Sequence, residues 1–533
     1  MNKYIWIIIA LGFIVFFPTF FNSFVMDDQG LILNNANVHS IANLFNFFRG
    51  SIFDYGGNLG GVYYRPMMST TFSFIYTFFG SSAFFYHFFQ LCLHITNSIL
   101  FFFVLKKFIK EKLSLVLSLI FLVHPIQVEA VAYIAALQEI LFFSFGVIYL
   151  LLLDRKKFAP LFILLALFSK ETGILFVPLG AVYSYLYRRK NLFMDSAGVG
   201  AAVIVALFMR FAVAHIGFEK TSEFVMMRTP FLERMVNVPL MIFYYLKTFL
   251  FPFSLVSVQS WLVTKINISD FFLPLVLDGI FFVILCVMSF IRRKKKERAL
   301  IFFWVWFLLG ILLHIQIVPL DLTVADRWFY FPLAGLLGIV GVLLNNMRFS
   351  KHIFYIALII ICLLSIRSFV RVFDWKDTKT LAQKDLAHQK DNYRLLSALG
   401  GVYLDEKNYS KAREVLSKSV ELYPHWGTSE YNLGVAYHMT NNTNMAKKYY
   451  KEALVDAPQY ILGYENMAIL LYYNNELESA TVFSKKALEK FPNSLKLWQV
   501  LGYASQKLGQ SEDATNAAQM IYLLNSRTTS TPQ

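Results

Sequence analysis

The chain begins with "MNKYIWIIIALGFIVFFPTFFNSFVMDDQG" (residues 1–30), an apolar run that ends in two adjacent carboxylates, Asp27 and Asp28. Residues 4–21 are long enough to cross the ~30 Å hydrocarbon core of a bilayer as a helix. A basic residue precedes the run, as in a signal peptide, but the bulky side chains at 20–22 do not suit a cleavage site. We therefore predict a retained first span, with both aspartates at the edge of the membrane.

The composition extends this prediction to most of the chain. Of 533 residues, 57% are hydrophobic and only 16% are charged, which is too apolar for a soluble domain. The net charge of +15 comes from short basic clusters between apolar runs, a pattern typical of membrane loops, and no groove-reading motif accompanies it. The three cysteines lie far apart in apolar segments. Nucleic-acid binding and a disulfide framework are therefore not expected.

Eleven apolar stretches are predicted to span the membrane. They are 4–21, 83–105, 113–123, 133–153, 158–169, 174–187, 196–214, 272–291, 299–316, 330–345 and 353–370. Two further stretches, 66–79 and 235–253, are interrupted by Pro, Lys or polar residues, so we predict interfacial or re-entrant helices on the outer side.

The loop charges predict an orientation. Basic clusters occur at Lys3, 106–110, 154–157, 188–190, 292–298 and 347–351, all on one side of the predicted spans. The positive-inside rule makes that side, and the N-terminus, cytoplasmic. The polar motifs "YYRP" (63–66), "HPIQVEA" (124–130), "SKETG" (169–173) and "DLTVADRWFY" (321–330) then lie with the aspartates on the extracytoplasmic face.

Beyond residue 371 a 34-residue period replaces the long apolar runs. It appears in three series: Pro424, Pro458 and Pro492; Ala412, Ala446, Ala480 and Ala514; and Gly400, Gly434 and Gly502, with Ala468 in the remaining place. This period and these small residues are typical of tetratricopeptide repeats. Because the number of spans is odd, the repeats are expected on the same side as the aspartates, where their concave surface is available to a peptide.

The sequence thus predicts an all-α chain. Its parts are a multi-span membrane domain over 1–370, a linker or cap helix over 371–392, repeats over 393–526 and a disordered tail over 527–533.

The polar residues of the outer face suit transfer of a sugar from a lipid phosphate. A carboxylate at Asp27 or Asp28 can act as general base toward an acceptor hydroxyl. Arg65, Lys170 and Arg327 can hold a phosphate and neutralise the charge that develops as it leaves. Each of these residues alone is also typical of a solvated loop or a structural ion pair.

Other chemistries have less support in the sequence. His124 with Glu129 and the two aspartates offers ligands for a divalent cation, but no tight ligand spacing is present, so no metal site is predicted. No Gly-rich phosphate loop or dinucleotide fingerprint appears. A donor carried by a polyprenol therefore fits better than a soluble nucleotide.

Five motifs followed by the repeats resemble a known family. "FVMDDQGLILNN", "YYRPMMSTTFSF", "HPIQVEAVAYIAAL", "FSKETGILFVP" and "VPLDLTVADRWFYFPLAGL" are together similar to the transmembrane and tetratricopeptide repeat proteins, a branch of the C-type glycosyltransferases. The resemblance implies a protein O-mannosyltransferase that uses a polyprenyl-phosphate sugar, with an acidic base in the first outer loop. It also implies supporting polar roles for His124, Glu129, Glu171 and Asp326.

The chain departs from the family pattern at two motifs. Gln138 and Glu139 stand where the family often has an Arg before an acidic residue, which puts the sugar in doubt. Asp326 replaces the common Glu of a later motif and keeps its charge.

Several alternatives stay open at this stage. The acceptor is a protein hydroxyl, or else a glycolipid or polysaccharide; in a third interpretation the chain is a non-catalytic scaffold that recruits partners through its repeats. The repeats alone also suit self-association. No cofactor is required, because cationic side chains can take the place of a metal. The expected location is a plasma membrane, or the endoplasmic reticulum membrane if the organism is eukaryotic.

Overall fold

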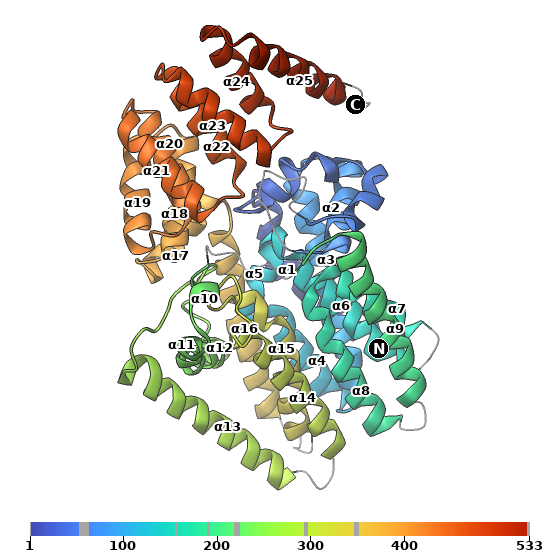
Figure 1. Cartoon of the computed structure of the whole chain (residues 1–533). Coiled ribbons are helices and arrows are strands. Elements are labelled where there is room, and N and C mark those ends of the chain that lie inside the picture. Colours follow the sequence, from blue (N-terminus) through green and yellow to red (C-terminus); the bar gives the residue numbers. More distant parts are fainter. Residues whose placement is uncertain are drawn as a thin grey trace. The chain divides into compact units, whose positions relative to one another are not determined.

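The computed structural model describes residues 2–52, 63–154, 158–188, 192–217, 224–292, 297–345 and 351–529. The described part is helical and divides into two units, one that ends at Lys390 and one that begins at Asp391 (Figure 1). The predicted all-α class is confirmed. Several of the basic loops predicted to be cytoplasmic, among them 155–157, 189–191 and 293–296, lie outside the described residues.

The first unit consists of helices joined by short helical turns. The helices are α1 (Asn2–Phe16), α2 (Pro66–Phe79), α3 (Ala83–Lys106), α4 (Glu111–Val123), α5 (Val128–Ala132), α6 (Leu137–Leu152), α7 (Ala159–Ser169), α8 (Phe176–Tyr187), α9 (Leu192–Phe208), α10 (Val225–Arg228), α11 (Phe231–Val236), α12 (Val238–Leu250), α13 (Leu273–Arg292), α14 (Glu297–His314), α15 (Tyr330–Leu344), α16 (Lys351–Asp374) and α17 (Thr378–His388). The turns that matter below are η5 (Pro125–Gln127), η6 (Ile134–Ala136), η7 (Glu171–Leu175), η9 (Met209–Val213), η10 (Ile268–Phe272) and η12 (Asp326–Phe329).

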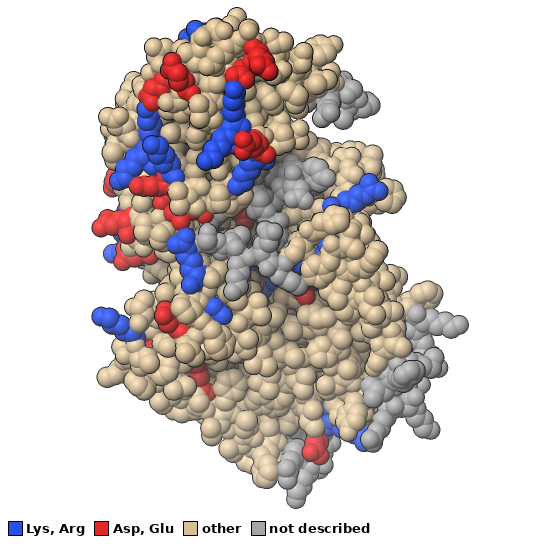
Figure 2. Space-filling model, in the orientation of Figure 1, with Lys and Arg blue, Asp and Glu red and all other residues tan. Residues whose placement is uncertain are grey.

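Each of the eleven apolar stretches forms a helix. Among the described residues, eight helices are long and apolar enough to cross a membrane, and α4 with η5–α5 adds a ninth if that pair, bent by 50°, is one span. The stretches at 158–169 and 174–187 form the shorter helices α7 and α8. On the face drawn in Figure 2, uncharged residues cover most of the surface of this unit, whereas charged side chains gather over the repeats, as expected for a membrane domain joined to a polar one.

Aromatic packing forms the core of the first unit. Trp306 of α14 is fully buried and lies 6.1 Å from the ring of Phe176 of α8 and 5.6 Å from that of Phe331 of α15 (ring centroids). Gly335 lets α15 approach α14 closely, because a Cβ there would lie 2.4 Å from the backbone nitrogen of Phe307. These contacts fix the helix ends from which the polar turns project.

Helix α17 packs on the rest of the first unit through a buried ion pair. Arg371 of α16 donates to Oδ1 of Asp385 at 2.7 Å, and both side chains are almost fully buried. The Ser257 backbone nitrogen (2.7 Å) and hydroxyl (2.6 Å) donate to Oδ2 of the same carboxylate. The segment after the last span is thus fastened to the loop between α12 and α13.

Replacing Arg371 by Leu tests this attachment. The Asp385 carboxylate would stay buried without its cation, which typically lowers the free energy of unfolding by about 3–5 kcal/mol. Chemical unfolding in detergent measures the change. Lys448→Ala, which removes only the exposed pair with Glu452, is the control and should cost at most about 1 kcal/mol; equal effects of the two variants would contradict the account.

The second unit is a series of antiparallel helix pairs. They are α18 (Tyr393–Asp405) with α19 (Tyr409–Leu422), α20 (Gly427–His438) with α21 (Thr443–Asp456), α22 (Ile461–Tyr473) with α23 (Leu477–Lys490), and α24 (Leu495–Lys507) with α25 (Ser511–Thr529). The turn within each pair needs a left-handed residue. Lys407, Asn441, Asn475 and Gly509 supply it at the 34-residue period, with φ between 57° and 71°. Helix α25 reaches Thr529, so residues 530–533 of the predicted tail lie outside the described residues.

Candidate active site

The two aspartates of the first loop have different environments. Asp28 is fully buried, and its two oxygens accept hydrogen bonds from the backbone nitrogens of Val25 (2.9 Å) and Ala135 (2.7 Å). Burial raises the pKa of Asp28 well above its usual value, against the opposing effect of these two donors. Both oxygens are therefore engaged in fastening the first loop to the turn η6.

Asp27 is the exposed member of the pair. Its carboxylate lies within electrostatic range of Tyr133, whose ring centroid lies 5.9 Å from the guanidinium carbon of Arg327. Asp27 thus presents a carboxylate to solvent near Tyr133.

Glu129 and Arg327 join two segments that are distant in the sequence. The backbone nitrogen of Arg327 donates to Oε2 of Glu129 at 2.8 Å, and its guanidinium bonds the other oxygen. Glu129 lies in the first turn of the short helix α5, after the bend at 124–125, and Arg327 lies in the turn η12 ahead of α15. Only 2% of the Glu129 side chain is exposed, so its charge requires this pairing.

Lys170 is the most deeply buried cation of the site. It follows α7 and forms an ion pair with Glu139 of α6. Burial lowers the pKa of Lys170, and the charge of Glu139 opposes that shift. Lys170 also lies within electrostatic range of Arg65 and Arg327, which connects the ion pairs into one cluster.

Glu171 is shared by two arginines. Arg65 approaches one oxygen at 3.3 Å and Arg210 approaches the other at 3.2 Å. Burial acts to raise the pKa of Glu171, but the charges of Arg65 and Arg210 outweigh this effect. The pKa of Glu171 is therefore below its usual value. Arg65 also lies against the ring of Tyr63, with its guanidinium carbon 4.3 Å from the centroid.

Arg210, Tyr133 and Tyr244 were not predicted from the sequence. A signal for Arg210 was present, because it is a lone cation within the apolar stretch 196–214, and ionisable residues in such segments usually face a functional interior. The tyrosines had no comparable signal, because buried aromatic residues are common in this chain.

Among the described residues, ion pairs join the cations of the cluster to glutamates. Four cations, Arg65, Lys170, Arg210 and Arg327, share three glutamates, Glu129, Glu139 and Glu171. The cationic side chains are each at most 14% exposed. Poorly solvated cations favour an anion, and Arg suits phosphate oxygens in particular.

Two predicted polar residues have structural roles. The ring nitrogen Nδ1 of His124 accepts from the backbone nitrogen of Ile126 (3.2 Å) and caps η5, while Nε2 bonds the carbonyl of Phe249 at 3.0 Å. Asp326 is buried and accepts a hydrogen bond from Tyr244 of α12. Within the part of the chain that the structure describes, no three His, Cys, Asp or Glu side chains are placed to hold a metal ion.

Comparisons with known proteins agree with both halves of this architecture. Residues 393–425 and 431–454 match the tetratricopeptide repeat family. The Protein O-mannosyl-transferase TMTC3 of Homo sapiens is 23% identical over 92% of this chain and 61% of its own length. A Protein O-mannosyl-transferase of Caenorhabditis elegans is 26% identical over 76% of this chain and 62% of its own length. The predicted resemblance to the transmembrane and tetratricopeptide repeat family is confirmed.

The match to this family covers most of the chain but only part of the relatives. The chain spans about three fifths of the length of the curated relatives it matches. Among solved structures, a crystal structure of MamA aligns with 28% of this chain and 86% of its own, at 22% identity and a TM-score of 0.27. The apolar helices and the similarity to these relatives support an integral membrane protein.

Asp28→Asn and Asp27→Asn form a matched pair that tests the structural difference between the aspartates. In Asp28→Asn an amide NH₂ group would replace one of the two acceptor oxygens, so one backbone N–H would lose its acceptor. A buried N–H without an acceptor typically lowers the free energy of unfolding by about 1–3 kcal/mol. The exposed Asp27→Asn should change stability by no more than about 0.5 kcal/mol. Thermal unfolding in detergent measures both, and a larger loss for the variant at 27 would refute the assignment.

Proposed function

We propose that the chain is a membrane-bound O-mannosyltransferase that moves a mannosyl group from a polyprenyl phosphate to Ser or Thr hydroxyls of proteins. Two findings support this proposal. The curated relatives that share most of this chain's length are named protein O-mannosyl-transferases. The site combines an exposed carboxylate with a set of nearly buried cations, as such a reaction requires.

The reaction is a single displacement at the anomeric carbon. The acceptor oxygen forms a bond to C1 of the sugar while the bond from C1 to the phosphate oxygen breaks, and the electron pair leaves with the polyprenyl phosphate. The proton of the acceptor hydroxyl passes to the carboxylate of Asp27, which acts as general base. Attack from the face opposite the phosphate inverts the configuration at C1.

The cations act on the leaving group. The donor is a phosphodiester with one negative charge, and cleavage of the C1–O bond adds a second. Arg65, Lys170, Arg210 and Arg327 lie in surroundings where little water screens them, so their attraction for the developing charge is strong. The cluster also needs no reorganisation, because its glutamates already hold the cations in place.

The observation that carries the proposal is the exposure of Asp27 near Tyr133, whose ring centroid lies 5.9 Å from the guanidinium carbon of Arg327. Asp28 has both oxygens bound to backbone nitrogens, so a proton accepted there would weaken the fastening of the loop. Asp27 can accept a proton at an oxygen that faces solvent.

The positive-inside pattern of the sequence supports an extracytoplasmic site with the repeats on the same side. A repeat surface there would bind acceptor proteins, and this favours a protein acceptor over a glycolipid. Mannose is the proposed sugar because of the relatives' names, although Gln138 departs from the family motif.

Transfer by purified protein in liposomes tests the proposal. With radiolabelled polyprenyl-phosphate mannose and a protein extract, the wild type should label the protein fraction. Asp27→Asn should lower the rate by about 10²–10⁴-fold, the usual contribution of a general base. Asp154→Asn removes a partly exposed carboxylate that pairs with Lys107, away from the cluster, and serves as control. Full activity of Asp27→Asn would refute the mechanism, and labelling of lipid alone would refute the protein acceptor.

A further inference from the structure

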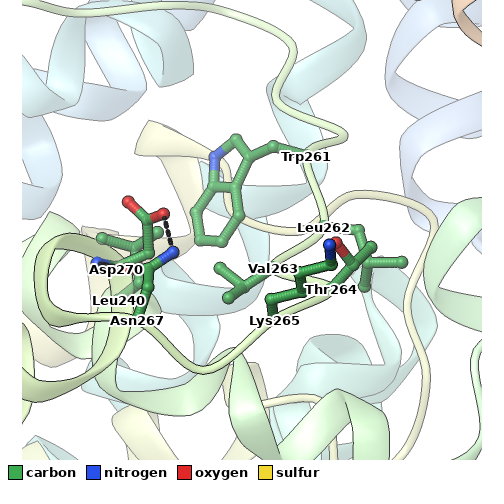
Figure 3. Close-up of a pocket in the computed structure, with 8 residues that line it drawn as sticks. All are labelled: Leu240, Trp261, Leu262, Val263, Thr264, Lys265, Asn267 and Asp270. Atoms are coloured by element: carbon green, nitrogen blue, oxygen red, sulfur yellow. Dashed lines mark hydrogen bonds between the residues drawn. The ribbon is translucent and has the colours of Figure 1, made fainter.

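A separate cavity of ≈ 400 Å³ lies beside the loop between α12 and α13. Its lining includes Leu240, Trp261, Val263, Lys265, Asn267 and Asp270, none of which belongs to the charged cluster (Figure 3). Its volume is in the range of small-molecule sites, which hold about 300–1,000 Å³.

Trp261 is partly buried against the core, lines the cavity, and is held in place by two hydrogen bonds. Its indole N–H donates to Oε1 of Gln259 at 3.0 Å, and its backbone carbonyl accepts from the Thr323 hydroxyl at 2.5 Å. Gln259 is buried and its own carbonyl accepts from the Thr323 nitrogen at 2.8 Å. A tryptophan that only anchors a membrane interface would direct its N–H to lipid head groups. Here the N–H points inward, and the electron-rich ring face is the part that a ligand can use.

Polar groups flank the indole. In Figure 3, Asp270 and Asn267 lie on one side of Val263, and Lys265 and Thr264 lie on the other. The Asn267 amide donates to Oδ2 of Asp270 at 2.7 Å, while Oδ1 has no hydrogen-bond partner among the described residues. A carboxylate oxygen, as in Asp270, accepts hydrogen bonds from hydroxyl groups, and an exposed ammonium group, as in Lys265, binds phosphate. An aromatic face between these groups suits a sugar phosphate.

The cavity also adjoins a helix that can cross a membrane. The apolar segment that contains η10 and α13 runs from Ile268 to Ile291. Ile266, Ile268 and Phe272 next to the cavity are 57%, 78% and 51% exposed. A ligand whose head group fills the cavity can therefore lay a hydrocarbon chain along α13.

We propose that this cavity binds the head group of a glycosyl polyprenyl phosphate, as a loading site distinct from the reacting cluster. The sugar ring lies on Trp261, its hydroxyls donate to Asp270, and Lys265 binds the phosphate. The identity of the lipid rests on the proposed function. The loop is suited to pass a donor onward, because Thr323, which bonds Trp261, precedes Arg327 of the cluster by four residues.

Binding of farnesyl-phosphate mannose to the full chain in nanodiscs tests this proposal. Calorimetric titration of the wild type should show two sites per chain. Trp261→Ala should weaken one of them about tenfold, as expected from the loss of ≈ 1.4 kcal/mol of aromatic contact. Trp261→Phe should retain most of the affinity, which separates loss of the ring from loss of the fold. The control is Trp6→Ala, because Trp6 is 67% exposed on α1.

Two comparison ligands identify the recognised parts. Farnesyl phosphate without the sugar should bind Trp261→Ala and wild type alike, and soluble mannose 1-phosphate should bind the cavity more weakly than the lipid. Equal binding of mannose 1-phosphate and the lipid would overturn the role of α13. In transfer assays Trp261→Ala should raise the KM for donor with kcat within about twofold, since uniform binding is lost.

The failures of the two proposals are distinguishable. If Trp261→Ala binds farnesyl-phosphate mannose at two sites with wild-type affinity, the loading site does not exist, whatever the transfer activity. If the tenfold loss occurs in a protein that transfers no sugar, the loading site stands and the proposed transferase is wrong.

Discussion

The burial of the Asp28 carboxylate is the constraint on which the rest of the site depends. Its two oxygens accept hydrogen bonds from the backbone nitrogens of Val25 and Ala135. These bonds join the loop after the first helix to the turn before α6. An asparagine in this place has a single acceptor oxygen and cannot accept in the same way from both nitrogens. The neighbouring Asp27 is thereby held on the outside of the loop, and its position relative to Tyr133 follows.

A second constraint is the sharing of charges inside the cluster. Removing charged groups from water is costly, and each cation here is offset by a glutamate from another segment of the chain. Such a network is weak evidence for stability. It has a clearer chemical meaning, because Arg65 and Arg210 lie together at one carboxylate and arginine suits the binding of phosphate oxygens. Perturbed ionisable groups in this arrangement are typical of functional sites.

The sequence predicted those features that depend on period and composition. The helices of the eleven apolar stretches and the repeats followed from hydropathy and the 34-residue period, because each is set by a pattern repeated over many residues. The choice between Asp27 and Asp28 could not be predicted, since it depends on which side chain turns toward the nitrogens of Val25 and Ala135. In the same way, His124 resembled a ligand in sequence, but in the fold its two ring nitrogens bond backbone groups at Ile126 and Phe249.

A structure of the protein with a bound, non-transferable polyprenyl-phosphate sugar would test the central claim most directly. The account predicts phosphate density in contact with the guanidinium or ammonium groups of the cluster, with C1 of the sugar facing the Asp27 carboxylate across the space for an acceptor oxygen. Phosphate bound away from Arg65, Lys170, Arg210 and Arg327, or a sugar that Asp27 cannot reach, would contradict it.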